Sequence, residues 1–133
     1  MPGVDTNVLV RWLVADDVLQ VRQVQRIFRE AVTSGQPLFV PISVSLELEW
    51  VLRARYGFDR ASVAQTFIAL LEARELQFQD EAAIERALHL FRHPPSADFA
   101  DCLHAALCAV AAHAPLLTFD AAAARLEGVK RIG

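Results

Sequence analysis

Carboxylates that stand beside short apolar segments are the residues of this chain best suited to chemistry. A charged group near an apolar core is costly unless a partner compensates for it. The acids in such positions are Asp5, Glu47, Asp98, Asp101 and Asp120. Each of them therefore needs either a structural partner in the fold or a ligand that its charge would bind.

Two of these acids open a predicted helix that follows Pro94-Pro95, with Ser96 or Ala97 near its cap. At about 100° per residue, Asp98 and Asp101 share one face of this helix. Carboxylates in a first helical turn are often present only because they complement the helix dipole. This segment alone does not separate that structural role from a functional one.

Asp5 ends a short apolar segment, and the polar residues Thr6 and Asn7 follow it. In open α/β sheets, ligands bind at the edge formed by the carboxyl ends of the strands. The sequence therefore allows two interpretations of Asp5. It is either an acid at such a sheet edge or an ordinary helix cap.

Glu47 lies in a predicted helix that is capped by Ser43 and ends at Tyr56, before Gly57. It stands beside the apolar stripe of this helix, where a carboxylate needs a partner. Glu49 points away from the stripe, and we expect it on the surface.

The remaining segments alternate between strands and helices. Further strands are predicted at 38–42, 76–78, 115–120 and 128–132, and the segment at 115–120 is expected to be buried and to end in Asp120. The order β-α-α-β-α-α-β-α-α-β-α-β favours a parallel sheet that helices cover on both faces. No repeat or linker divides residues 1–133, so we expect a single domain.

Composition excludes several classes of protein. The chain is 54% hydrophobic and 22% charged, as globular proteins are. No apolar run is long enough for a membrane span and no export signal precedes the domain, so we expect a cytoplasmic protein. The net charge of −3 does not exclude a nucleic-acid partner. Removing the charges of Asp5, Glu47, Asp101 and Asp120 leaves +1, and all basic residues except Lys130 are arginines, which suit phosphate.

In the expected fold, four carboxylates gather at one edge of the sheet: Asp5, Glu47, Asp101 and Asp120. Gathered acids repel one another without a cation, and oxygen ligands suit Mg²⁺ or Mn²⁺. Such a site can assist the hydrolysis of a phosphodiester. His89 and His93 lack a third ligand, and we do not expect zinc there.

Four motifs at these separations resemble the PIN domain, in particular the VapC-type toxins of bacterial toxin–antitoxin pairs. They are Val-Asp5-Thr-Asn-Val-Leu, Glu47-Leu-Glu-Trp-Val-Leu, Ala-Asp98-Phe-Ala-Asp101-Cys-Leu-His-Ala-Ala and Leu-Thr118-Phe-Asp120. The resemblance implies a three-layer α/β/α fold with a five-stranded parallel sheet. It also implies Mg²⁺- or Mn²⁺-dependent cleavage of RNA by an activated water, a homodimer, and inhibition by a cognate antitoxin.

By motif, the catalytic and metal-binding acids are Asp5, Glu47, Asp101 and Asp120. Thr6, Asn7 and Thr118 are supporting polar residues. Asp98 is an additional acid that either binds a metal itself or stands at the rim of the pocket.

Two alternatives remain open on the sequence. A receiver-type signalling module also gathers carboxylates at a sheet edge, but it needs an acidic pair after the first strand, where Asp5 is followed by Thr6 and Asn7. The second alternative is a domain that binds metal or RNA without turnover. For the homodimer contact and the antitoxin groove we expect the helices at 44–56 and 59–73, whose large apolar residues include Trp50 and Phe67.

Overall fold

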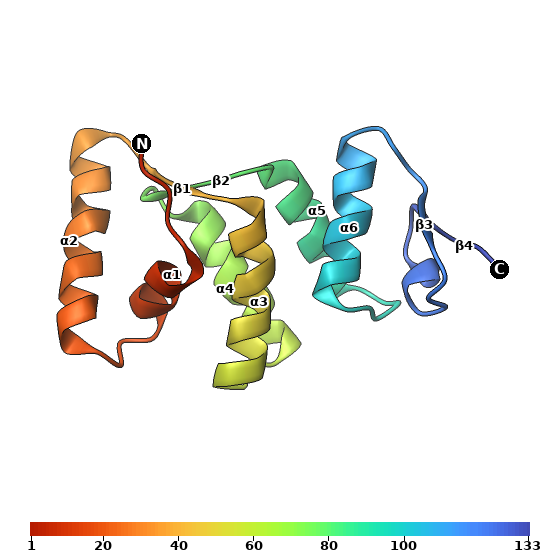
Figure 1. The fold of residues 1–133 in the computed structure, drawn as a ribbon, viewed down its shortest axis with the longest axis horizontal. Helices are drawn as coiled ribbons and strands as arrows, with labels where there is room; N and C mark the ends of the chain where they lie inside the picture. The colour runs from red at the N-terminus through yellow and green to blue at the C-terminus, as the bar shows by residue number, and fades with distance from the viewer.

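The computed structural model describes residues 1–133 and has the order of helices and strands that the sequence predicts, except that the first predicted strand is an extended segment with a single bridge at Gly3 (Figure 1). The helices are α1 (Thr6–Leu13), α2 (Val18–Ser34), α3 (Ile42–Tyr56), α4 (Arg60–Glu72), α5 (Glu81–Arg92) and α6 (Phe99–Val110), with a 3-10 turn η1 (Ala123–Arg125). The strands are β1 (Leu38–Val40), β2 (Leu76–Phe78), β3 (Leu116–Thr118) and β4 (Val129–Arg131). None of the helices is both long enough and apolar enough to cross a membrane.

Local signals fix most helix ends. The carboxylate of Asp17 accepts from the backbone N–H of Gln20 at 3.0 Å and caps α2. Asp59 caps α4 in the same way through Ser62, at 2.8 Å. Gly57 ends α3 at φ 68°, a left-handed conformation that glycine adopts without steric penalty.

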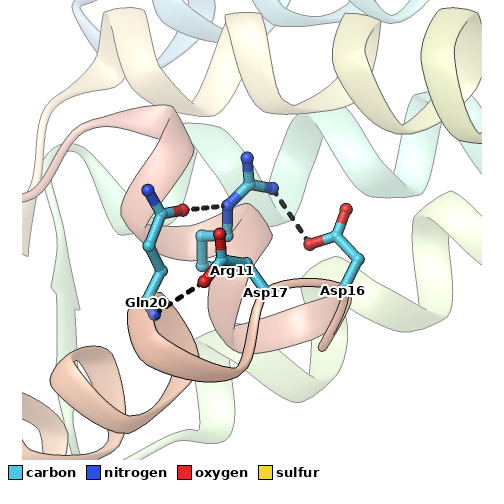
Figure 2. Close-up of polar contacts among 4 residues, drawn as sticks. All are labelled: Arg11, Asp16, Asp17 and Gln20. Atoms are coloured by element: carbon cyan, nitrogen blue, oxygen red, sulfur yellow. Dashed lines mark hydrogen bonds and ion pairs between the residues drawn. The ribbon is translucent and has the colours of Figure 1, made fainter.

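A polar cluster holds the corner between α1 and α2 (Figure 2). Arg11, in the last turn of α1, pairs with Asp16 at 3.2 Å and donates a second hydrogen bond to the side chain of Gln20. Together with the capping hydrogen bond of Asp17, these contacts hold the last turn of α1 against the start of α2. They thereby help to fix the orientation of α1, whose first turn carries the candidate site residues.

Two helices begin at different residues from those predicted. α3 starts at Ile42, whose backbone N–H donates to the Gln79 side chain at 2.9 Å, so Ser43 is not its cap. α6 starts at Phe99 with Asp98 in the cap position, later than the predicted cap at Ser96 or Ala97. The carbonyl of Ala97 accepts from the guanidinium of α4 residue Arg60 at 2.9 Å, which keeps Ala97 outside the helix.

All strand pairs are parallel, as predicted, but they form two separate groups. β1 pairs with β2, and Gly3 forms a single bridge to Phe39 on the other side of β1. β3 pairs only with β4. Figure 1 shows α5 and α6 between the two groups. The single five-stranded sheet implied by the resemblance is therefore not observed.

The main core lies among the helices. Phe67 of α4 and Phe99 of α6 stack with ring centroids 5.3 Å apart, and Phe91 of α5 meets Phe99 edge-on at 5.5 Å. Phe67 is completely buried, so the prediction that it belongs to an exposed contact surface is wrong. Trp50, the other aromatic residue of that prediction, is 49% exposed.

The segment from β3 to β4 (residues 116–131), here called the C-terminal unit, is attached to the rest of the molecule mainly through α6. Leu126 is buried in the main core, whereas Leu117 is 57% exposed and Phe119 is 74% exposed. The expectation of a buried strand at 115–120 is thus wrong. Its physical reason is that β3 has a neighbour on one edge only and no helix over both of its faces.

Candidate active site

Asp5 lies where the first extended segment meets α1. One of its carboxylate oxygens accepts from the backbone N–H of Val8 at 3.1 Å, so Asp5 is the cap of α1. The structural role allowed by the sequence is therefore confirmed, and the second carboxylate oxygen has no hydrogen-bond partner. The side chains of Asp5 and Asn7 are exposed at this end of α1.

Thr6 links this end of α1 to α3. Its hydroxyl donates a short hydrogen bond to the carboxylate of Glu47, and Thr6 itself is only 4% exposed. Glu47 thus has the partner that its position on α3 requires. Because the bond joins segments distant in sequence, it fixes the distance between Glu47 and the start of α1.

Glu49, expected on the surface, is 4% exposed. Its carboxylate accepts from the guanidinium of Arg53 at 2.9 Å, one helical turn further along α3. The hydrogen bond and charge of Glu49 raise the pKa of Arg53. The expectation was wrong because α3 contacts α1, α4 and α6, so its buried surface is wider than one apolar stripe.

Asp98 and Asp101 lie at the start of α6, as predicted. Asp98 occupies the cap position without a capping hydrogen bond and is exposed. Asp101 lies in the first turn and is partly buried. Burial raises the pKa of Asp101, and the negative charges of Asp120 and Asp98 raise it further, while His104 acts in the opposite direction.

Arg60 holds the approach to this end of α6. Its guanidinium donates to the carbonyl of Phe91 at 2.8 Å and to that of Ala97 at 2.9 Å, and it lies 3.9 Å from the centre of the Phe91 ring. Arg60 therefore ties α4 to the end of α5 and to the residue before Asp98. Nothing in the local sequence around Arg60 indicated this role.

Asp120 lies in the turn that follows β3. Its carboxylate accepts from the backbone N–H groups of Ala122 at 2.7 Å and Ala123 at 3.3 Å. Its own N–H donates to the hydroxyl of Thr118 at 3.0 Å. These bonds hold Asp120 near the start of α6, where its charge acts on Asp101.

The candidate acids therefore form two groups. The first half-site consists of Asp5, Thr6 and Glu47, and the second consists of Asp98, Asp101 and Asp120. The charges that shift the pKa of Asp101 include neither Asp5 nor Glu47. No three acidic, histidine or cysteine side chains lie close enough to hold one metal ion. As arranged within one chain, these residues do not fit the divalent cation that the resemblance implies.

Other candidate groups have structural roles. His93 contacts the carbonyl of His89 at 2.7 Å through a ring nitrogen, and the two rings pack together. Cys102 and Cys108 are free thiols, and burial raises the pKa of Cys102 to about 11. The Arg53–Glu49 pair was missed in the sequence, although its spacing of four residues is a known helical ion-pair signal.

Comparison with known proteins adds independent information on the whole chain. A profile of the PIN domain matches residues 4–129, a range that includes both half-sites. Among curated proteins, the VapC ribonuclease of Aquifex aeolicus (strain VF5) is 27% identical over 103 residues. The matched region covers 77% of this chain and 75% of that protein.

Proposed function

The chain belongs to the PIN domain family, and from this premise we propose that it is a ribonuclease that hydrolyses phosphodiester bonds of RNA. The observation that carries the proposal is the family match across residues 4–129, which spans every candidate acid. The name of the similar Aquifex protein, a ribonuclease, supports RNA as the substrate class. We propose the toxin of a toxin–antitoxin pair as the cellular role.

The contacts within each half-site indicate what its residues do. Thr6 holds Glu47 at a fixed position beside the start of α1. The turn bonds of Asp120 hold its carboxylate where its charge raises the pKa of Asp101. A carboxyl group with a raised pKa is a better proton acceptor than an ordinary aspartate, so Asp101 is suited to take a proton from an attacking water.

The proposal includes the Mg²⁺ or Mn²⁺ dependence that the resemblance implies. Carboxylate and hydroxyl oxygens are the donors that such hard cations prefer, and the candidate residues offer no other kind. The division of the acids into two half-sites disagrees with a single cation site in one chain. We assign no step to a cation.

The test is cleavage of a panel of RNAs (tRNA, rRNA fragments and mRNA) with Mg²⁺, with Mn²⁺ or with EDTA, followed by mapping of the ends. We expect cleavage at defined positions with either cation and its loss in EDTA. Asp5→Asn and Asp120→Asn should each lower the rate by orders of magnitude while the circular dichroism spectrum is unchanged.

Asp17→Asn is the matched control for these variants. It makes the same chemical change, and asparagine caps a helix about as well as aspartate, so we expect the wild-type rate. Cleavage that is equally fast in EDTA would refute the cation dependence. Full activity of both Asp5→Asn and Asp120→Asn would refute the assignment of the site.

A cognate antitoxin is the proposed protein partner, and the cytoplasm, where RNA substrates occur, is the proposed location. Trp50 is exposed on α3 one helical turn from Glu47, so a protein that covers Trp50 would also cover the first half-site. The partner is sought in the product of the neighbouring gene. It should bind this protein and inhibit cleavage, and a product that does neither is not the antitoxin.

A binding role without turnover is the second candidate function, and the divided half-sites favour it. It differs from a nuclease in one measurable respect. A binding domain would retard RNA in a gel and leave its length unchanged under every cation condition, whereas a nuclease shortens it. The receiver-type alternative is set aside because the chain belongs to the PIN domain family.

A further inference from the structure

A surface cavity lies between α3 and the start of α6, and it borders both half-sites. Its volume is about 380 Å³, and its lining includes Glu47, Trp50, Arg53 and Ala100. Glu47 belongs to the first half-site, and Ala100 directly precedes Asp101 of the second. A ligand that is longer than a single ion can therefore lie in this cavity and be adjacent to both half-sites.

Trp50 provides the aromatic surface of this cavity. It is 49% exposed, whereas Leu48 and Leu52 of the same helix are completely buried. The exposed part of the indole ring therefore adds nothing to the core. Aromatic rings in this situation are the surfaces on which proteins stack the unpaired bases of RNA, because every base has a flat π-face.

Arg53 lines the same cavity with part of its guanidinium free. Its Nε donates to the buried carboxylate of Glu49 at 2.9 Å, while its two terminal nitrogens make no hydrogen bond. The side chain of Arg53 is 54% exposed. Glu49 thus fixes the orientation of the guanidinium and leaves its terminal N–H groups available. A phosphate is the acceptor that suits such a pair of donors.

A second cation lies beside the indole ring. The guanidinium carbon of Arg55 is 5.9 Å from the centre of the Trp50 ring, and Arg55 forms no ion pair. An aromatic ring with guanidinium groups beside it complements a nucleotide, which combines a flat base with a negative phosphate. An apolar segment of a protein needs the ring alone, so the arginines favour RNA as the occupant.

We propose that an unpaired base of the RNA substrate stacks on Trp50, and that Arg53 holds the phosphate of the same nucleotide. This inference rests on the proposed function and narrows the substrate to RNA that is unpaired beside the bond to be cut. A base that is stacked within a duplex is not available to Trp50. Because the cavity borders Glu47, the stacked base also determines which phosphodiester bond lies at the acids.

The chain has two tryptophans, and this allows stacking to be observed without an assay of activity. Trp12 packs against Phe28 with ring centroids 4.1 Å apart, so Trp12→Phe keeps an aromatic ring there and leaves Trp50 as the only tryptophan. The probe is an unpaired oligo-A or oligo-U RNA of about eight nucleotides. The proteins also carry Asp120→Asn, so that the RNA stays uncut in Mg²⁺, and a gel verifies its length.

The RNA should quench the emission of Trp50 in the Trp12→Phe protein, and the quenching should saturate. In the Trp50→Phe protein, the emission of Trp12 should not change. Absence of quenching in the first protein, or equal quenching in both, would overturn the proposal. A hairpin that pairs the same bases should quench Trp50 much less, and equal quenching by the hairpin would overturn the restriction to unpaired RNA.

Three substitutions of Trp50 separate stacking from mere apolar contact. Trp50→Phe retains a flat ring, whereas Trp50→Leu retains apolar bulk without one and Trp50→Ala removes both. In Trp50→Leu and Trp50→Ala the KM for unpaired RNA should rise about 5- to 150-fold, the contribution of one stacked base. The kcat should be little affected, because the stack is present in both the ground state and the transition state. Trp50→Phe should raise KM much less, and equal KM values for Trp50→Phe and Trp50→Leu would overturn the stacking.

Salt dependence tests the phosphate contact of Arg53. Arg53→Met is combined with Glu49→Gln, so that no buried carboxylate is left without a partner. Loss of one phosphate contact should reduce the slope of log Kd against log salt concentration by about 0.7. Arg74→Met removes an exposed arginine outside the cavity and is the matched control. An unchanged slope in the double variant, or an equal reduction in the control, would overturn the role of Arg53.

The experiments also separate this inference from the proposed function. Quenching of Trp50 by RNAs that the wild-type protein never cleaves would refute the proposed function and leave the stacking intact. Cleavage with the wild-type KM in both Trp50→Leu and Trp50→Ala would refute the stacking alone. Trp50 variants that cleave RNA normally but are no longer inhibited by the antitoxin would assign the ring to a protein contact and overturn the proposal.

Discussion

The hydroxyl of Thr6 donates a hydrogen bond to the carboxylate of Glu47, and through it the start of α1 is tied to α3. Thr6 is buried and Glu47 is exposed, so the bond runs from the interior of the molecule to its surface. The buried Thr6 thus fixes the position of the Glu47 carboxylate on the surface of the molecule.

Thr6→Val should destabilise the protein by about 1 kcal/mol, the usual contribution of one hydrogen bond. Thr6→Ser retains the hydroxyl and is the matched control. Urea unfolding of Thr6→Val, Glu47→Gln and the double variant gives the coupling between the two residues. Strictly additive effects would show that the bond contributes nothing to stability.

Asp101→Asn should raise the melting temperature at neutral pH. Because the pKa of Asp101 is raised in the folded protein, its ionised form is less favourable there than in the unfolded chain. The difference from wild type should vanish below the ordinary aspartate pKa, where the group is protonated in both states. Thermal unfolding between pH 3 and pH 8 measures it.

Asp59→Asn is the control variant, because hydrogen bonds from Ser62 lower the pKa of Asp59, whereas the pKa of Asp101 is raised. It should give no stabilisation at neutral pH. A melting temperature for Asp101→Asn that is equal to or below that of wild type at neutral pH would contradict the prediction.

Arg53→Met should destabilise the protein by about 1–3 kcal/mol, because it leaves the buried carboxylate of Glu49 without its partner. Adding Glu49→Gln should recover part of the loss. Arg55→Met removes an exposed arginine from the same helix, and we expect a change within about 0.5 kcal/mol. Denaturant unfolding compares the variants, and equal losses for Arg53→Met and Arg55→Met would show that the pair is not structural.

Asp101→Asn should lower the cleavage rate by about 10²-fold or more, the usual contribution of an acid or base that handles a proton. Asp98 is exposed and its carboxylate makes no hydrogen bond, so Asp98→Asn should have a smaller effect. Single-turnover rates on one RNA substrate measure the difference. The reverse order of the two rates would assign the main role to Asp98.

The order of the secondary-structure elements could be predicted from the sequence because its signals are local. Asp17 and Asp59 cap the helices that they precede, and Gly57 ends α3. The start of α6 was misplaced because its boundary depends on Arg60, which is distant in sequence. The local sequence pattern does not indicate a contact with a residue that is so distant in sequence.

The surroundings of the candidate acids were predicted less well. Asp98 and Asp101 lie at the start of α6 and Asp120 follows β3, as expected. Glu47 lies in the second turn of α3 and not in its first, and Glu49 is the buried glutamate of that helix. An apolar stripe identifies the buried side of a helix that packs on one neighbour, whereas α3 has several. The pairing of the strands could not be predicted either. The apolar sequence of β3 predicts a buried strand whether or not another strand pairs with its second edge.

The guanidinium of Arg60 joins three segments, and this has a consequence for hydrogen exchange. Residues 93–98 have no regular secondary structure, and on that ground their amides would exchange by small local fluctuations. The bonds to the carbonyls of Phe91 and Ala97 tie both ends of this stretch to α4. Its opening therefore belongs to the same cooperative unit as the helices beside it, and the start of α6 does not fray independently.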